Sequence, residues 1–419
     1  MKLIFHGGAG EVGRSCIEVV TAKNRFLLDA GVQLGEETLY PTKIDNVPKI
    51  DGILLSHAHL DHSGALSYLQ SRGLKCPVYM TAATKDIAKV LLKDFFHVES
   101  LNHIPPYEKS NVFASFDLFK IKDYNQGFEI KDAYAKFFDA GHVPGSAFIV
   151  LEADGKRIAY SGDIKYDETR LMKGAHVEVK DVDALIIETT YGDREHPERK
   201  KTEKEFLNKV KETLARGGQV FIPSFAVGRA QEILLLLHSE KWEVPVYLDG
   251  IGQTITNLIV EHNACKDREK LIAARAKTVF IMGRKEREQA LKGQGIFVTT
   301  SGMLTGGPII EYLKVGHQNP NNAILITGFV SEGTNGRLLL DEGAVFIEGR
   351  RTKVQAEYHQ YDFSAHAGLE ELQRLIQKIN PKKLILVHGE TAALEHLAEL
   401  ERKKGKEIFV PQADSELTI

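Results

Sequence analysis

Histidine and aspartate are concentrated in one six-residue stretch, His57-Ala-His59-Leu-Asp61-His62, which directly follows the apolar run IDGILLS. Neutral imidazole nitrogen and carboxylate oxygen are the usual protein ligands of zinc and similar borderline ions. A tight loop between a strand and a helix can direct alternate side chains to two neighbouring ions. Three histidines at these offsets would arise by chance only about 0.02 times in a chain with this histidine content. The stretch therefore predicts a metal site rather than a merely polar turn.

Further histidine and acidic residues stand at the ends of predicted strands. The loops at strand ends gather on one rim of an α/β sheet, so we expect these side chains to approach the first group. Taken singly, each is more often a turn residue than a ligand. The positions are Asp29, His142, Asp163, Glu188, His366 and His388.

Length and composition describe a folded chain. Its 419 residues allow two or three domains, and 43% hydrophobic with 26% charged residues argues against wholesale disorder. The net charge of -3 excludes a generally basic surface, so any polyanion site must be local. Cys16, Cys76 and Cys265 form no CxxC pair, which argues against a disulfide framework or a thiolate zinc cage. No stretch is apolar enough to span a membrane, and we expect a soluble, cytoplasmic protein.

The elements that must position these side chains follow from the apolar pattern. The first half alternates short apolar runs with Gly- and Asp-rich turns, which predicts strands, with helices over 63–71 and 84–96. The charged stretch DREHPERKKTEKE predicts a boundary and a helix that begins at a capping box of Thr202 and Glu205. Strands and helices then alternate strictly to about residue 350, as in a parallel α/β unit. The last 60 or so residues are too few for their own core, so we expect them to complete the first half.

The ordered set of motifs closely resembles the β-CASP family of metallo-β-lactamase fold nucleases over almost the whole chain. In that resemblance Asp29, the HxHxDH run, His142 and Asp163 are the four general motifs. The segments SFAVGRAQE, SGMLTGGP and GFVSEGTNGR also look familial. The opening GGAGEVGRS and the sequence SAHA look most like the cleavage and polyadenylation specificity factor branch, of archaeal or bacterial type, rather than bacterial ribonuclease J. The three family-specific motifs would be Glu188, His366 and His388.

The resemblance implies an α/β (α+β) fold: a metallo-β-lactamase αββα sandwich with an inserted β-CASP α/β domain. The sandwich would take residues 1–193 and 358–419, and the β-CASP domain residues 194–357. Because no extension precedes the first motif, we do not expect the N-terminal KH domains that some archaeal relatives carry.

The same resemblance implies two Zn²⁺ ions as cofactors. Two ions about 3.5 to 4 Å apart lower the pKa of a shared water and clamp the oxygens of a phosphodiester. Asp61 would also orient the attacking water, and Asp29 would brace the HxHxDH loop without binding metal. One ion would be held by His57, His59 and His142, the other by Asp61, His62 and His388, with Asp163 between them.

Glu188 and His366 would form a pair beside the metals, with the imidazole contacting the scissile phosphate or protonating the leaving oxygen. The alternative is a salt-bridged histidine that only packs two parts of the chain together. Ser364 could donate to a phosphate oxygen, and glycine-rich turns could present backbone N–H groups to phosphates. Arg229 could bind phosphate or lock a domain interface. The candidate RNA contacts are Ser364, Arg229, Ser301 and Gly333.

Charge runs are usually solvated faces, but Arg350, Arg351 and Lys353 precede the strand that leads to His366 and could track a nucleic-acid backbone. Tyr358, Tyr361 and the nearby Phe363 could stack bases, although alternate aromatic residues in a strand are more often core.

The expected function is a zinc-dependent ribonuclease that cleaves single-stranded RNA endonucleolytically, with 5′-to-3′ trimming as a further activity, in RNA processing or decay. A metallo-β-lactamase-type thioester or other small-molecule hydrolase is the alternative enzyme, because the HxHxDH core alone is shared by such enzymes. An inactive scaffold subunit is the non-enzymatic alternative, although every ligand position is filled here. A homodimer or partners in an RNA-processing complex would fit either role, and no membrane partner is expected.

Overall fold

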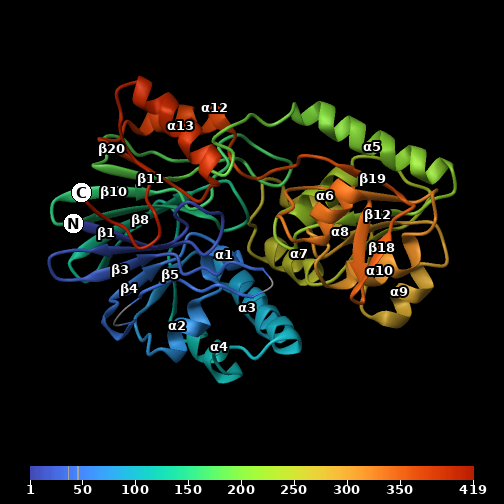
Figure 1. The fold of residues 1–419 in the computed structure, drawn as a ribbon, viewed down its shortest axis with the longest axis horizontal. Helices are drawn as coiled ribbons and strands as arrows, with labels where there is room; N and C mark the ends of the chain where they lie inside the picture. The colour runs from blue at the N-terminus through green and yellow to red at the C-terminus, as the bar shows by residue number, and fades with distance from the viewer. Residues whose placement is uncertain (36, 45–46) are drawn as a thin grey trace. The chain divides into compact units, whose positions relative to one another are not determined.

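The computed structural model describes residues 1–35, 37–44 and 47–419, which divide into two compact units (Figure 1). The first unit contains Met1–Glu168, Met172–Glu195 and His366–Ile419, and the second contains Thr169–Leu171 and His196–Ala365. Each unit has its own buried apolar clusters. Among the described residues, none of the helices combines the length and the apolar character that crossing a membrane requires.

The first unit is built on two seven-stranded sheets. In spatial order the first sheet contains β22 (Glu416–Thr418), β1 (Lys2–Gly7), β2 (Cys16–Val20), β3 (Arg25–Leu28), β4 (Gly52–Leu54), β5 (Val78–Met80) and β6 (Phe119–Ile121). The second contains β21 (Glu407–Phe409), β20 (Lys383–Val387), β11 (Ala184–Glu188), β10 (Lys156–Tyr160), β9 (Ala147–Ala153), β8 (Ala133–Asp139) and β7 (Gly127–Ile130). One buried cluster joins Phe5 and Phe26 of the first sheet to Phe137, Ile149 and Ile186 of the second, so the two sheets pack face to face.

Helices cover the outer faces of this sandwich. A second cluster packs Leu372 of α12 and Leu394 of α13 against Phe148, Leu185 and Leu384 of the second sheet. Figure 1 shows α12 and α13 beside β20 and β11, and α2 and α3 on the side of β5. The helices of this unit are α1 (Leu60–Ser63), α2 (Leu66–Ser71), α3 (Ala82–Asn102), α4 (Lys109–Phe116), α12 (Leu369–Ile379) and α13 (Thr391–Lys403). The αββα architecture expected from the resemblance is confirmed.

The end of the chain completes both sheets of the first unit. β20 pairs with β11 in parallel, with Lys383 opposite Ala184, and β22 pairs antiparallel with β1. Hydrogen-bonded neighbours are thereby far apart in sequence, since Ala184 and Lys383 are 199 positions apart and Lys2 and Thr418 are 416 positions apart. The last residues of the chain therefore pair with strands of its first half.

The second unit contains a six-stranded sheet whose neighbouring strands are all parallel. Its order is β14 (Thr278–Ile281), β13 (Val246–Asp249), β15 (Ile296–Thr299), β12 (Val220–Pro223), β16 (Ala323–Ile326) and β19 (Glu357–Gln360). The accompanying elements are α5 (Arg199–Ala215), α6 (Arg229–Leu237), α7 (Gly252–Glu261), α8 (Arg268–Ala276), α9 (Arg284–Ala290), α10 (Pro308–Gly316), α11 (Asn335–Glu342) and the ribbon of β17 (Ala344–Ile347) and β18 (Arg350–Lys353). The strand-helix alternation predicted from sequence is present over most of this unit, but α7 and α8 follow one another directly, and so do β17, β18 and β19.

Two local expectations differ from the structure. The predicted capping box is wrong, because α5 begins at Arg199 and the Thr202 hydroxyl donates to the carbonyl of Glu198 within the first turn. The boundary expected at residue 358 also differs from the division at His366. β19 pairs with β16, so its residues extend the sheet of the second unit rather than the sandwich.

Candidate metal centre

The loop between β4 and α1 carries the first four site residues. His59 caps the start of α1 with an extended backbone, and Asp61 and His62 lie in its single turn. Nε2 of His57 lies 3.1 Å from Nδ1 of His59. The HxHxDH spacing therefore places several ligand atoms around one point, because the chain changes there from strand to helix.

Two loops from the second sheet complete a first cluster around His57 and His59. His142, between β8 and β9, places Nε2 3.3 Å from Nδ1 of His59. Asp163, which follows β10, places Oδ2 3.6 Å from Nε2 of His57 and 3.5 Å from Nε2 of His142. The ligand atoms of these four residues all lie within 4.8 Å of one another.

A second cluster shares Asp163 with the first. Its Oδ1 lies 3.2 Å from Nε2 of His62 and 3.5 Å from Nδ1 of His388, which follows β20. Nε2 of His388 lies 3.3 Å from Oδ2 of Asp61. The ligand atoms of Asp61, His62, Asp163 and His388 also lie within 4.8 Å of one another. The structure thus brings together all seven predicted metal-ligand residues in two groups that meet at one carboxylate.

The clusters contain polar atoms that the protein itself leaves unsatisfied. Nε2 of His59 is buried and has no hydrogen-bond partner, and the buried Nε2 of His62 and Oδ1 of Asp163 have none apart from their own contact at 3.2 Å. A buried polar atom without a partner costs free energy, so such atoms are rare in a folded chain. A bound cation would satisfy them, and the donor set of imidazole nitrogen and carboxylate oxygen suits a transition metal. These residues fit a metal.

The electrostatics of the clusters favour the same conclusion. Burial lowers the pKa of His57, with a further contribution from the charge of His62, so its imidazole is neutral as a metal ligand must be. Burial opposes ionisation of Asp163, but His62 and His388 outweigh it and lower the pKa of that carboxyl. Despite burial, the neighbouring carboxylates raise the pKa of His62 and of His388. When protonated, these two rings balance negative charge on Asp61 and Asp163, which a bound cation would also balance.

Asp29 braces the site without belonging to either cluster. The fully buried carboxylate lies 2.6 Å from Nδ1 of His62 and accepts hydrogen bonds from the Ser56 amide at 2.6 Å, the Ser56 hydroxyl at 2.7 Å and the Tyr160 hydroxyl at 2.7 Å. The Ser56 hydroxyl also lies 3.0 Å from Nδ1 of His57. Contacts to the far nitrogen of a ligating histidine fix its ring orientation and tautomer.

Sequence reasoning missed Ser56 and Tyr160 in this brace. Ser56 immediately precedes His57, which was an available signal, but the hydroxyl of Tyr160 becomes relevant only when the two sheets face each other. Two backbone positions were also missed. Asp29 has φ of +63° and His388 has φ of +49°, a left-handed conformation that non-glycine residues rarely adopt.

Glu188 and His366 lie beside the clusters. Nδ1 of His366 is 3.0 Å from Oε1 of Glu188 and 3.9 Å from Oδ2 of Asp163. The Glu188 carboxylate also accepts from the amide of Ile164 at 2.9 Å, so its position is fixed by the backbone. Burial opposes the charge of His366, but Glu188 and then Asp163 outweigh it and raise its pKa to about 9. The predicted pair is present as a contact.

The four candidate RNA contacts belong to the second unit. The Arg229 guanidinium donates to the carbonyl of Thr327, and the buried Ser364 donates its amide to Asp362 at 2.8 Å. The Ser301 hydroxyl accepts from the amide of Thr305 at 3.2 Å, and Gly333 has φ of +75°. These contacts give each residue a local structural role, and their contact with RNA stays a prediction.

Comparison with protein families divides the chain into three matched segments. Residues 24–215 match the Beta-lactamase superfamily domain and residues 230–339 the Beta-Casp domain. Residues 351–411 match the Zn-dependent metallo-hydrolase RNA specificity domain. The third segment includes His366 and His388.

Full-length relatives agree with these matches. The chain is 42% identical to "Probable RNase MJ4" of Methanocaldococcus jannaschii, with 100% of both chains covered. It is 35% identical to "RNase aCSPSF2" of Saccharolobus solfataricus, covering 99% of this chain and 84% of the relative, and 32% identical to "Ribonuclease TTHA0252" of Thermus thermophilus, covering 97% of each. A crystal structure of a protein of unknown function from Enterococcus faecalis shares the fold, with a TM-score of 0.60, 16% identity and coverage of 100% and 99%. The chain therefore belongs to the β-CASP ribonuclease family of the metallo-β-lactamase superfamily.

Proposed function

We propose that the protein is a zinc-dependent ribonuclease that hydrolyses phosphodiester bonds of single-stranded RNA. The observation that carries the proposal is the meeting of two four-residue metal-ligand groups at Asp163. Paired metal sites of this type are suited to phosphodiester hydrolysis. The relatives described as ribonucleases and the match of residues 351–411 to an RNA specificity domain support RNA as the substrate.

The residues would hold two zinc ions, with Asp163 as the shared ligand. When bound, the ions supply Lewis-acid chemistry that activates water at neutral pH and neutralises charge on a phosphodiester. The ligand sets would be His57, His59 and His142 for one ion and Asp61, His62 and His388 for the other.

The side chains of the site would orient the attacking water, hold the ligand rings in place and donate a proton to the leaving oxygen. Asp61 keeps about 32% of its side chain exposed, whereas Asp163 exposes 2%, so Asp61 is the carboxylate that can accept a hydrogen bond from an incoming water and orient it. His366 exposes 22% and can donate a proton to the leaving oxygen, while Glu188 fixes its ring. Asp29 holds His62 in the orientation that directs Nε2 toward Asp163.

The second unit and the segments around it would guide the RNA. In this proposal the first unit carries the catalytic site, and the second unit is the β-CASP domain with Arg229, Ser301 and Gly333 as phosphate contacts. Ser364 would serve the same purpose. We propose endonucleolytic cleavage with 5′-to-3′ trimming in RNA processing, by a homodimer or within a larger complex. The three cysteines are free thiols, which suits the reducing cytoplasm.

The test combines metal analysis with cleavage of end-labelled single-stranded RNA carrying a 5′-phosphate or a 5′-triphosphate. We expect two zinc ions per chain by mass spectrometry. His59→Ala and Asp163→Asn should each lose cleavage by about a thousandfold, because several kcal/mol of transition-state stabilisation are lost, and should still fold. The matched controls are His176→Ala, which changes a surface histidine that is 71% exposed, and Asp167→Asn, which changes a carboxylate that is 52% exposed.

Two results would overturn the proposal. Thioester turnover without RNA cleavage would identify a small-molecule hydrolase. Wild-type protein that holds no stoichiometric metal and cleaves no RNA would identify a scaffold.

A further inference from the structure

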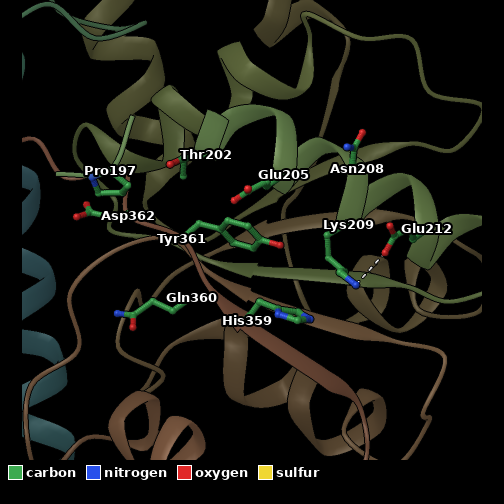
Figure 2. A pocket seen from close by; sticks show the side chains of 10 residues that line it. All are labelled: Pro197, Thr202, Glu205, Asn208, Lys209, Glu212, His359, Gln360, Tyr361 and Asp362. Carbon is green, nitrogen blue, oxygen red and sulfur yellow. Dashed lines mark ion pairs between the residues drawn. The ribbon is translucent and has the colours of Figure 1, made fainter. Parts of the chain in front are cut away.

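A groove of about 530 Å³ runs between α5 and β19 in the second unit (Figure 2). One wall is a face of α5 that includes Glu205 and Lys209, and the other is the strand end around His359 and Tyr361. Figure 2 shows Glu205 pointing from the helix toward the ring of Tyr361. All residues that line the groove belong to the second unit, so its shape depends on this unit alone.

β19 is one of the two edge strands of the six-stranded sheet among the described residues, and β14 is the other. The amides of Glu357 and Tyr361 donate to carbonyls of Asn322 and Ile326, at 3.0 and 2.8 Å, on the side of β16. Because alternate residues of a parallel strand bond to opposite sides, the backbone groups of Tyr358 and Gln360 face the open edge. Such an edge can pair with another extended chain.

An aromatic side chain in the groove provides a surface against which an added strand could pack. The ring of Tyr361 lies edge-on to Phe206 of α5, with centroids 5.3 Å apart. Phe206 is fully buried, so Tyr361 is anchored while its hydroxyl end lies in the groove. A groove between an edge strand and a helix is one of the recurring ways in which proteins bind extended peptides.

The charged side chains of the groove indicate which charge a bound segment should carry. The carboxylate of Glu357 pairs with three basic side chains, at 2.8 Å from Lys209, 2.6 Å from Arg216 and 2.6 Å from His359. Lys209 also pairs with Glu212, as the dashed line in Figure 2 shows. In contrast, the carboxylate of Glu205 makes neither a hydrogen bond nor an ion pair within the part of the chain that the structure describes.

The groove therefore presents unneutralised negative charge beside an aromatic ring. Burial raises the pKa of the Tyr361 phenol to about 12, and Glu205, Glu357 and Glu212 add to that effect against Lys209. A lysine or arginine side chain could pair with Glu205 and lie against the ring of Tyr361. Phosphates would be repelled by the same carboxylates. A second copy of this chain would bring another set of carboxylates toward the first.

We propose that this groove binds a basic, extended segment of a partner protein as an added strand along β19, with a cationic side chain between Glu205 and Tyr361. The backbone groups of Tyr358 and Gln360 supply the hydrogen bonds of the added strand. The site is separate from the residues assigned to RNA cleavage, so it stands or falls independently of that function.

The probe is a fluorescein-labelled peptide of alternating valine and lysine, seven residues long, whose binding to the whole protein is followed by fluorescence anisotropy. We expect it to bind about tenfold or more tightly than a peptide with glutamate in place of lysine, because a charge-assisted contact is exchanged for a repulsive one. The same lysine peptide with N-methylated amides on its pairing edge should also bind about tenfold more weakly, because it cannot donate to β19.

Two pairs of variants separate the contributions. Glu205→Lys should weaken binding of the lysine peptide about tenfold, whereas Glu269→Lys, at an 82% exposed position on α8, should leave it unchanged. Gln360→Pro removes an amide that faces the open edge, where proline is tolerated in a sheet, and should abolish binding. Gln360→Ala keeps that amide and should bind normally. Circular dichroism melts of all variants confirm that each is folded.

Specific results would overturn the proposal. These are equal binding of the lysine and glutamate peptides, undiminished binding in folded Glu205→Lys or Gln360→Pro, and no binding at about 1 mM protein, the limit of weak association. Displacement of the peptide by a short single-stranded RNA would assign the groove to RNA. A dimer in sedimentation that Gln360→Pro dissociates would assign it to a second copy.

Discussion

Nδ1 of His366 lies 3.0 Å from Oε1 of Glu188, and the two side chains differ sharply in their access to solvent. Glu188 is fully buried, whereas His366 exposes 22% of its side chain. The buried carboxylate is held by the backbone amides of Ile164 and Thr190, at 2.9 and 3.3 Å. The contact therefore ties an accessible imidazole to a fixed anion.

The first prediction concerns the pH profile of cleavage. Glu188 raises the pKa of His366, so an imidazolium that donates a proton stays charged to higher pH. In Glu188→Gln the decline of kcat at high pH should begin at lower pH, and kcat should fall about tenfold to a hundredfold. The measurement is kcat against pH with zinc saturating. Glu178→Gln, beside the exposed His176, is the control. A lower Tm with an unchanged pH profile would reduce the pair to a packing contact.

The second prediction concerns Asp29. Replacement by Asn removes an acceptor from Nδ1 of His62, so zinc affinity should fall about tenfold to a hundredfold. Tyr160→Phe removes one hydrogen bond to the same carboxylate but leaves the contact with His62, so it should have a smaller effect. Competition with a colorimetric chelator measures both affinities. Equal losses in the two variants would contradict the proposed role of Asp29.

The third prediction concerns metal removal. All seven expected ligands lie in the first unit, and the second unit has its own buried clusters. Removal of zinc by a chelator should therefore lower the Tm of the first unit by several degrees and change the Tm of the second unit much less. Differential scanning calorimetry with and without chelator measures this. Equal shifts of all transitions would show that the two units unfold together or that the metal lies elsewhere.

The fourth prediction concerns acid stability of the second unit. Burial opposes ionisation of Asp362, but the hydrogen bond and the charge of His196, 2.9 Å away, lower its pKa to about 2. Because the pKa of Asp362 is lower in the folded state than its unfolded value of about 3.9, the ionised carboxylate stabilises the fold at pH values above about 3.9. This stabilisation is lost as the pH falls toward about 2. Because 30% of the side chain is exposed, the contribution is about 1 to 2 kcal/mol.

Asp362→Asn should therefore be less stable than the wild type at pH 7, and the difference should shrink between pH 4 and about 2. Urea denaturation of both chelated proteins at each pH gives the free energies of unfolding. The exposed pair of Arg337 and Asp341 provides the control variant Asp341→Asn, which should change stability by less than about 1 kcal/mol. A difference that does not depend on pH would contradict the assignment.

The sequence could predict the cluster of potential metal ligands because its residues have fixed chemistry and lie at strand ends. His57, Asp163 and His388 each follow an apolar run, and the packing of two sheets brings those ends together. The return of β20 to β11 could also be predicted, because a short segment with two helices needs an outside surface to bury its apolar faces.

The start of α5, the sheet that β19 joins and the hydrogen bond between Tyr160 and Asp29 could not be predicted, because they depend on tertiary structure. Thr202 and Glu205 match a capping box, but the helix begins one turn earlier, and Thr202 bonds back to Glu198 instead. β19 has the same apolar and aromatic pattern whichever sheet it joins, so periodicity could not assign it to β16. The hydroxyl of Tyr160 is 131 residues from Asp29 along the chain, and no local pattern indicates that hydrogen bond.

The contact between Asp61 and His388 joins residues 327 positions apart. A ribosome releases the amino-terminal part first, and parts of a protein begin to fold during synthesis. A nascent chain therefore exposes the HxHxDH loop long before His388 exists. Until translation has passed that residue, the group of Asp61, His62, Asp163 and His388 is incomplete, so the proposed catalytic site cannot form on the unfinished polypeptide.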